Sequence, residues 1–158
     1  MDHTKVRKAT AADMASVHQL IAELARYERA ENEFELSVND LLEDGFGTNP
    51  IFECLVACDG DQVVGFALFY TKYSTWKGRC LFLEDFIVTQ SHRGQGYGAA
   101  LFQALISIAR DRRVKRLEWQ VLEWNEPAIQ FYQKFGAHLD PEWLNGKLVF
   151  QQLQAFPS

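Results

Sequence analysis

Three glycines alternate with other residues in one short run of the chain, Arg93-Gly94-Gln95-Gly96-Tyr97-Gly98. Residues 81–88 before it are apolar and aromatic and have the length of a strand, while Ala, Leu and Ile recur at helical spacing through residues 99–110 after it. A glycine turn between a strand and a helix collects backbone N–H groups at the positive end of the helix dipole, and glycine lets a ligand approach them closely. The sequence therefore predicts a phosphate-binding turn.

The glycine spacing excludes two common phosphate-binding loops. A dinucleotide loop has the pattern Gly-x-Gly-x-x-Gly, whereas these glycines fall at 94, 96 and 98. A nucleotide triphosphate loop needs Gly-Lys followed by Ser or Thr, and the sequence contains no such tripeptide. The remaining pattern is Arg-x-x-Gly-x-Gly at a strand-to-helix turn.

Two adjacent carboxylates, Glu84 and Asp85, interrupt the apolar strand that leads into this turn. Two carboxylates inside so apolar a segment are unusual, and the alternative is that they form a solvated strand end. Carboxylates serve both as general acids and bases and as counter-ions for a bound cation. We therefore regard this pair as candidate active-site residues.

The composition bounds the class of protein. With 158 residues, 47% of them hydrophobic and 13% aromatic, the chain is long and apolar enough for one folded domain. It contains no run of 18 apolar residues and no apolar core of a signal peptide, which argues against a membrane protein. A net charge of −5 without a long basic block argues against nucleic-acid binding and favours a cationic partner.

The cysteine count points to a reducing compartment. The chain has three cysteines, Cys54, Cys58 and Cys80, and an odd number without a secretion signal is typical of reduced cytoplasmic thiols. The four histidines are scattered along the chain, so no set of metal ligands is recognisable. We expect buried packing thiols and no metal.

Hydrophobic periodicity and capping signals predict one compact α/β domain. Thr10 with Asp13, and Ser37 with Asp40, have the spacing of helix capping boxes, and Asn125 followed by Pro127 marks a further helix start. The predicted strands cover residues 6–8, 51–58, 63–71, 79–88, 116–122 and 147–153. The predicted helices cover residues 11–29, 38–45, 98–112 and 126–136.

Four further blocks occur in order around the glycine run: Leu41–Gly47, Tyr73–Gly78, Leu83–Phe86 and Glu123–Tyr132. Together they resemble the spermidine/spermine and thialysine branch of the GNAT superfamily of N-acetyltransferases. The resemblance implies an α/β (α+β) GNAT fold, with a central mixed, mostly antiparallel sheet of about six to seven strands and about four helices. It also implies a single domain over residues 4–153.

The resemblance implies transfer of acetyl from acetyl-CoA to a small cationic amine, such as a polyamine, thialysine or a lysine- or ornithine-like amino acid. A primary amine has a pKa of about 10.4, so on the order of one molecule in 10³ is nucleophilic at neutral pH. By resemblance, Glu84 is the base that removes the proton through water. Tyr132 matches the acid that protonates the CoA thiolate, and Asp85 belongs to the amine site.

Each remaining site residue also follows from the resemblance. The backbone of Phe86, Ile87 and Val88 would pair with pantetheine, and Arg93, Gly94, Gln95, Gly96, Tyr97, Gly98 and Ala99 would hold the pyrophosphate. Asn125, Glu126, Pro127 and Ala128 would line the far side of the CoA slot. Tyr27, Glu28, Trp76, Glu84 and Asp85 would surround the amine, with Glu118, Trp119 and Gln120 as a further wall.

The sequence departs from the family pattern at one place, and two alternative functions remain open. The family usually shows a Gly-Trp pair before its last strand, whereas here Trp143 comes earlier and Leu144-Asn145-Gly146-Lys147 follows. A protein lysine or N-terminal acetyltransferase, or a CoA-binding sensor without catalysis, would also suit the glycine turn. The resemblance further implies a homodimer, while the sequence itself shows no interface signature.

Overall fold

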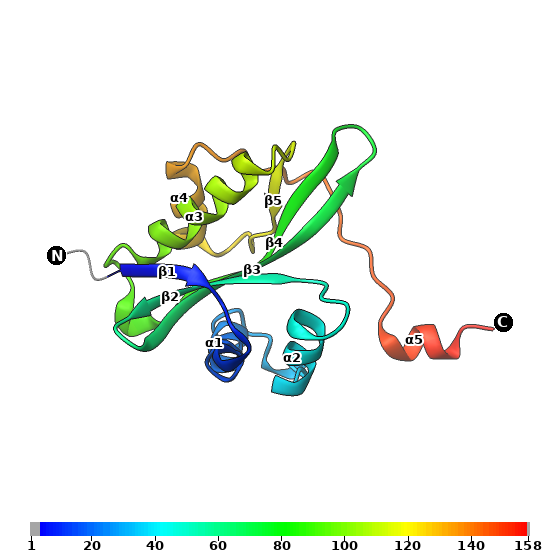
Figure 1. Cartoon of the computed structure of the whole chain (residues 1–158). Coiled ribbons are helices and arrows are strands. Elements are labelled where there is room, and N and C mark those ends of the chain that lie inside the picture. Colours follow the sequence, from blue (N-terminus) through cyan, green and yellow to red (C-terminus); the bar gives the residue numbers. More distant parts are fainter. Residues whose placement is uncertain (1–3, 158) are drawn as a thin grey trace. The chain divides into compact units, whose positions relative to one another are not determined.

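The computed structural model describes residues 4–157 and divides into two compact units, one up to Gln120 and one from Val121 onward (Figure 1). The first unit contains a five-stranded sheet with the order β1-β2-β3-β4-β5. Its strands are β1 (Thr4–Lys8), β2 (Glu53–Asp59), β3 (Gln62–Ser74), β4 (Gly78–Val88) and β5 (Leu117–Trp119). Neighbouring strands run antiparallel except for the parallel pair β4 and β5, so the sheet is mixed as predicted. Within residues 4–157 the sheet has fewer strands than the predicted six to seven.

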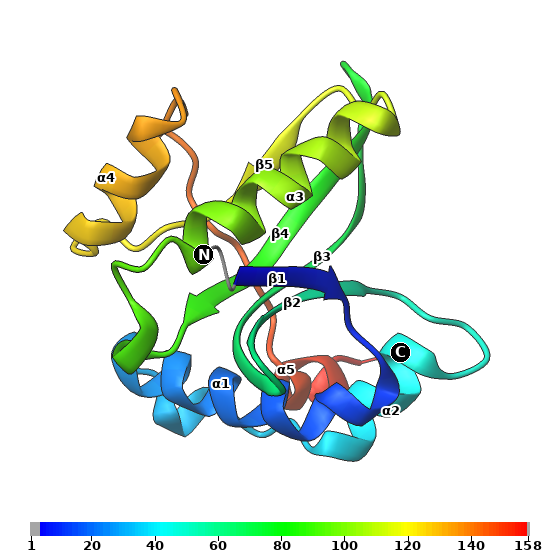
Figure 2. The same cartoon turned by 60° about the vertical axis from the view of Figure 1, so that its left-hand side comes forward.

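Helices cover both faces of this sheet. The first unit contains α1 (Met14–Tyr27), α2 (Val38–Phe46) and α3 (Tyr97–Asp111), with short 3-10 turns at Ala11–Asp13, Glu31–Glu33 and Gln90–His92. Figures 1 and 2 show α1 and α2 on one face of the sheet and α3 on the other. No helix among residues 4–157 is long and apolar enough to cross a membrane.

Both predicted capping boxes of the first unit are confirmed. The backbone N–H of Thr10 donates to Asp13 Oδ2 at 2.7 Å, and that of Ser37 donates to Asp40 Oδ2 at 2.9 Å. Such contacts satisfy N–H groups that a helix start leaves without intrahelical partners. Helix α1 then buries one apolar face against β2, β3 and β4. The buried residues of this core are Met14, Val17, Leu20, Leu41, Cys54, Val56, Cys58, Phe66, Leu68 and Ile87.

A β-bulge interrupts the long β3–β4 ladder. Leu68 pairs with Asp85, but the next residue, Phe69, pairs with Leu83, so Glu84 is the extra residue of β4. A bulge bends a strand and re-aims its side chains. The two carboxylates predicted from sequence therefore lie where the strand departs from regular alternation.

The second unit contains α4 (Glu126–Lys134) and α5 (Phe150–Ala155). The start of α4 confirms the predicted cap, because Asn125 Oδ1 accepts from the N–H of Ala128 at 3.4 Å and a proline occupies the first turn. The predicted strand at 147–153 is wrong. Instead, Gln152 Oε1 accepts from the N–H of Val149 at 2.9 Å and starts α5. A short apolar run fits a strand or a helix equally well by periodicity, and here the cap decides.

Candidate active site

The glycine turn joins β4 to α3. Gly94 has φ of 74° and Gly96 has φ of 91°, a left-handed region that favours glycine. A Cβ at either position would meet nothing within 4 Å, so backbone conformation rather than crowding by the chain requires glycine here. The N–H of Ala100 bonds to Gly96 O at 3.0 Å and begins the helical pattern. The N–H groups before it form the cradle expected at a helix start.

Side chains within the turn fix its shape. Arg93 Nε donates to the carbonyl of Val88 at 2.9 Å, and Gln95 Nε2 donates to the carbonyl of Ser91 at 3.1 Å. His92 Nε2 lies 3.3 Å from Asp59 Oδ2 in the β2–β3 hairpin. The contact between His92 and Asp59 therefore connects the glycine turn to the end of the sheet where β2 and β3 meet. These residues fit a pyrophosphate group, because the helix N-terminus, the left-handed glycines and Arg93 all favour an anion.

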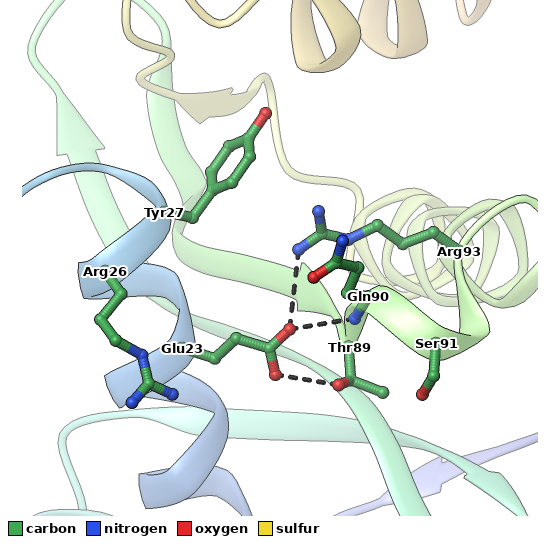
Figure 3. A pocket seen from close by; sticks show the side chains of 7 residues that line it. All are labelled: Glu23, Arg26, Tyr27, Thr89, Gln90, Ser91 and Arg93. Atoms are coloured by element: carbon green, nitrogen blue, oxygen red, sulfur yellow. Dashed lines mark hydrogen bonds and ion pairs between the residues drawn. The ribbon is translucent and has the colours of Figure 1, made fainter.

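Glu23 on α1 connects that helix to the turn (Figure 3). Its Oε2 accepts from Thr89 Oγ1 at 2.9 Å, and its Oε1 accepts from the N–H of Gln90 at 3.0 Å. The Arg93 guanidinium lies 3.8 Å from Glu23 Oε1 and stacks over the Tyr27 ring at 5.1 Å. A pocket of about 760 Å³ opens here, lined by Glu23, Arg26, Tyr27, Thr89, Gln90, Ser91 and Arg93.

The pairing of β4 with β5 ends before the turn, because β5 is only three residues long. They pair only from Leu81 opposite Leu117 to Leu83 opposite Trp119, and β4 then continues to Val88. The three residues predicted to hold pantetheine, Phe86, Ile87 and Val88, lie on this continuation. An extended ligand can add to a strand edge through main-chain hydrogen bonds. The continuation of β4 therefore suits an extended group that leads to the phosphate turn.

An acidic cluster forms at the bulge. Partial burial, with smaller contributions from the charges of Glu84 and Glu28, raises the pKa of Asp85 to about 7. Burial also raises the pKa of Glu28, at the C-terminal end of α1. Tyr70 on β3 donates to Glu84 Oε2 at 2.9 Å. A cation bound here would relieve the repulsion among the three carboxylates, so the cluster suits an ammonium group.

Glu118 and Trp119 of β5 contact other side chains of the first unit. Glu118 Oε2 lies 3.1 Å from Lys72 Nζ, and Glu118 Oε1 lies 3.5 Å from Arg116 Nε. The Trp119 ring meets the Phe102 ring edge-on at 5.4 Å. Gln120 ends the first unit directly after β5. The negative charge of Glu118 is thus already balanced by two basic groups.

Trp76 lies in the turn between β3 and β4 and is 84% exposed. The ladder runs from Phe69 to Ser74 beyond the bulge, five steps along the strand, which places that turn roughly 17 Å or more from Glu84. The structure therefore does not bring Trp76 to the carboxylates of the same chain. Its predicted place in the amine site stays a prediction.

Five predicted residues belong to the second unit. Asn125 caps α4, and Glu126, Pro127 and Ala128 form its first turn. Tyr132 is buried, and its ring meets that of Phe131 edge-on at 5.4 Å. Their predicted contacts with acetyl-CoA stay predictions.

Sequence reasoning missed Glu23 and Tyr70, and it also missed the pocket-lining residues Arg26, Thr89, Gln90 and Ser91. Glu23 precedes Tyr27 by four residues on α1, and residues at this spacing share a helix face, which was the available signal. Tyr70 contacts Glu84 only because β3 and β4 pair as antiparallel strands, so no local sequence pattern predicts this contact.

The fold defines an α/β protein with a glycine turn after β4 and an acidic cluster at the β4 bulge and the end of α1. Residues 14–137 match the acetyltransferase (GNAT) family, and the chain belongs to this family. It is thus an N-acetyltransferase by family, and GNAT acetyltransferases use acetyl-CoA.

Three known proteins illustrate the similarity. A thialysine N-epsilon-acetyltransferase from Bos taurus is 38% identical over 145 residues, covering 87% of this chain and 85% of that protein. Spermidine/spermine N(1)-acetyltransferase-like protein 1 from Homo sapiens is 41% identical over 144 residues, covering 87% of this chain but 21% of that protein. This chain therefore spans about a fifth of the human protein. An integron cassette protein from V. cholerae shares the fold, with a TM-score of 0.79 at 24% identity over 98% of this chain and 97% of that one.

Proposed function

We propose that this protein transfers acetyl from acetyl-CoA to a primary amine of a small cationic molecule: a polyamine, thialysine, or a lysine- or ornithine-like amino acid. One observation carries the proposal. Glu84 and Asp85 lie on the strand that leads to the proposed phosphate turn, and Glu28 at the C-terminal end of α1 adds a third carboxylate to the cluster. An ammonium group and a phosphate-bearing acyl donor would thus be bound at neighbouring points of one strand. The names of the bovine and human relatives support an amine acceptor.

The chain's own groups suggest how the amine reacts. The carboxylates hold the ammonium group, and Glu84 accepts its proton through a water molecule. The free nitrogen then attacks the thioester carbonyl, a C–N bond forms, and the C–S bond breaks. Tyr132 gives a proton to the departing thiolate, while the new amide nitrogen loses its extra proton to solvent, from which the tyrosine is reprotonated. Because the nucleophile and the donor are held together, the reaction gains the advantage of proximity.

The residues that we propose for acetyl-CoA binding follow from the family resemblance. In the first unit these are Phe86, Ile87 and Val88 for pantetheine and the turn from Arg93 to Ala99 for the pyrophosphate. In the second unit they are Asn125, Glu126, Pro127 and Ala128. We also propose that residues 4–153 act as one GNAT domain, because the family match from 14 to 137 extends across both units. A homodimer and a cytoplasmic location are further proposals; the buried free thiols of Cys54, Cys58 and Cys80 agree with a reducing compartment.

A thiol-release assay tests the function. The protein is incubated with acetyl-CoA and with spermidine, spermine, thialysine, lysine or ornithine, beside a Glu84→Gln variant. We expect strong release with one of these amines and a large loss in the variant. Isothermal titration with acetyl-CoA is run on both proteins. Binding without release on any amine would reject the small-amine proposal and favour a protein substrate or a sensor.

A further inference from the structure

We propose that Tyr70 is a positioning residue for Glu84: its hydroxyl fixes one carboxylate oxygen and leaves the other to receive the amine proton. This inference rests on the proposed function, in which Glu84 is the base. The two side chains come from adjacent strands, β3 and β4, and their oxygens lie 2.9 Å apart. A carboxylate accepts only, so the tyrosine is the donor.

Glu84 needs such a partner because of where it lies. It is the extra residue of the bulge and is exposed to solvent. A glutamate side chain has several rotatable bonds, and an exposed one samples many rotamers. Proton transfer requires the base within hydrogen-bond reach of the proton or of one relaying water. Fixing Oε2 narrows the positions that Oε1 can occupy.

Tyr70 is suited to this role by its own surroundings. Its ring packs against Phe82 with centroids 5.6 Å apart, and Lys72 Nζ lies 5.3 Å from the centroid of the same phenylalanine. Burial, followed by the hydrogen bond and charge of Glu84, raises the pKa of Tyr70 to about 12. The hydroxyl therefore keeps its proton throughout the range in which the enzyme would work, and it donates without interruption.

The other charged groups near Glu84 do not replace the tyrosine. Asp85 on β4 and Glu28 at the end of α1 bring further carboxylates, which accept hydrogen bonds when ionised rather than donate them. Lys72 is paired with Glu118.

The test compares Tyr70→Phe with the matched control Tyr73→Phe, which removes a hydroxyl from an exposed tyrosine of the same strand. For Tyr70→Phe we expect kcat/KM to fall about tenfold at neutral pH. The loss should lie in kcat, with the KM for the amine and the affinity for acetyl-CoA unchanged. Tyr73→Phe should match the parent protein. An unchanged kcat in Tyr70→Phe would overturn the inference.

Two further measurements separate this inference from the proposed function. Combined with Glu84→Gln, the Tyr70→Phe change should cause little additional loss, because both act through one group. Full additivity would contradict the inference while leaving the acetyltransferase intact. Carbon-13 NMR of the Glu84 side-chain carboxyl needs no turnover. If its chemical shift at neutral pH is the same in the parent protein and in Tyr70→Phe, the inference is wrong even if no amine is ever acetylated.

Discussion

The carboxylate of Glu23 and the backbone N–H of Gln90 are joined by a hydrogen bond of 3.0 Å across 67 residues of sequence. The same carboxylate accepts from Thr89 and faces Arg93 (Figure 3). Helix α1 ends at Tyr27, next to Glu28 of the acidic cluster. The Glu23 side chain therefore connects α1, whose C-terminal end carries Glu28 of the proposed amine site, to the turn that we propose binds phosphate.

Replacing Glu23 by Gln should weaken acetyl-CoA binding. Glutamine retains one acceptor oxygen but loses the charge that faces Arg93, and it cannot accept from Thr89 and Gln90 with two oxygens at once. We expect a loss of about tenfold in affinity, measured by isothermal titration. Glu43→Gln on the exposed side of α2 is the control. Equal affinity in all three proteins would show that the turn keeps its shape without Glu23.

Asp85 should make stability fall as the pH rises. Its pKa in the folded protein is about 7, against an ordinary value of 3.8, so between these values the folded state retains a proton that the unfolded chain loses. The free energy of unfolding therefore decreases from about pH 4 to about pH 7. Asp85→Asn should remove this decrease and gain about 1–3 kcal/mol relative to the parent protein between pH 4 and pH 8.

Urea unfolding at several pH values checks this prediction, with the exposed Asp61→Asn as control. Parallel stability curves for the parent protein and Asp85→Asn would contradict it. A saturating amine substrate should reduce the difference, because a bound ammonium group favours the ionised carboxylate.

Local signals explain which parts of the fold could be predicted from the sequence. The capping pairs Thr10–Asp13 and Ser37–Asp40 lie within four residues, and both were confirmed. The strand predicted at 147–153 was wrong because a short apolar run does not distinguish a strand from a helix. The sheet also has fewer strands within residues 4–157 than predicted.

The site required information that local patterns do not carry. Glu84 and Asp85 could be recognised because they are charged residues in an apolar strand. The bulge that makes Glu84 an extra residue, however, depends on the β3–β4 register. The contacts of Tyr70 with Glu84 and of Glu23 with Gln90 join residues 14 and 67 positions apart. Such pairs exist only after the chain has folded.

Asp13 should matter for acid stability. Arg7 donates to its two oxygens at 2.7 and 2.9 Å, and this hydrogen bonding lowers the pKa of Asp13 to about 2. The resulting stability is present above the ordinary value of 3.8 and is lost as the pH falls toward 2. Asp13→Asn should cost about 2–3 kcal/mol at neutral pH, measured by urea unfolding.

Asp40→Asn is the matched control, since Asp40 also belongs to a capping box but is exposed and has Ser37 as its partner. Its loss should be smaller. If the two variants lose the same stability, the ion pair with Arg7 adds nothing to the cap.

Tyr132 gives the sharpest test of the proposed proton donor. Replacing it by Phe retains the buried ring and removes only the hydroxyl, so folding and acetyl-CoA affinity should be preserved. If the hydroxyl protonates the departing thiolate, kcat should fall by about 10²-fold near neutral pH. A thiol has a pKa of about 8.5, so the thiolate can leave without a proton in alkaline solution. The deficit of Tyr132→Phe should therefore be smaller at high pH than at neutral pH, and a deficit that is constant with pH would indicate a role in positioning instead.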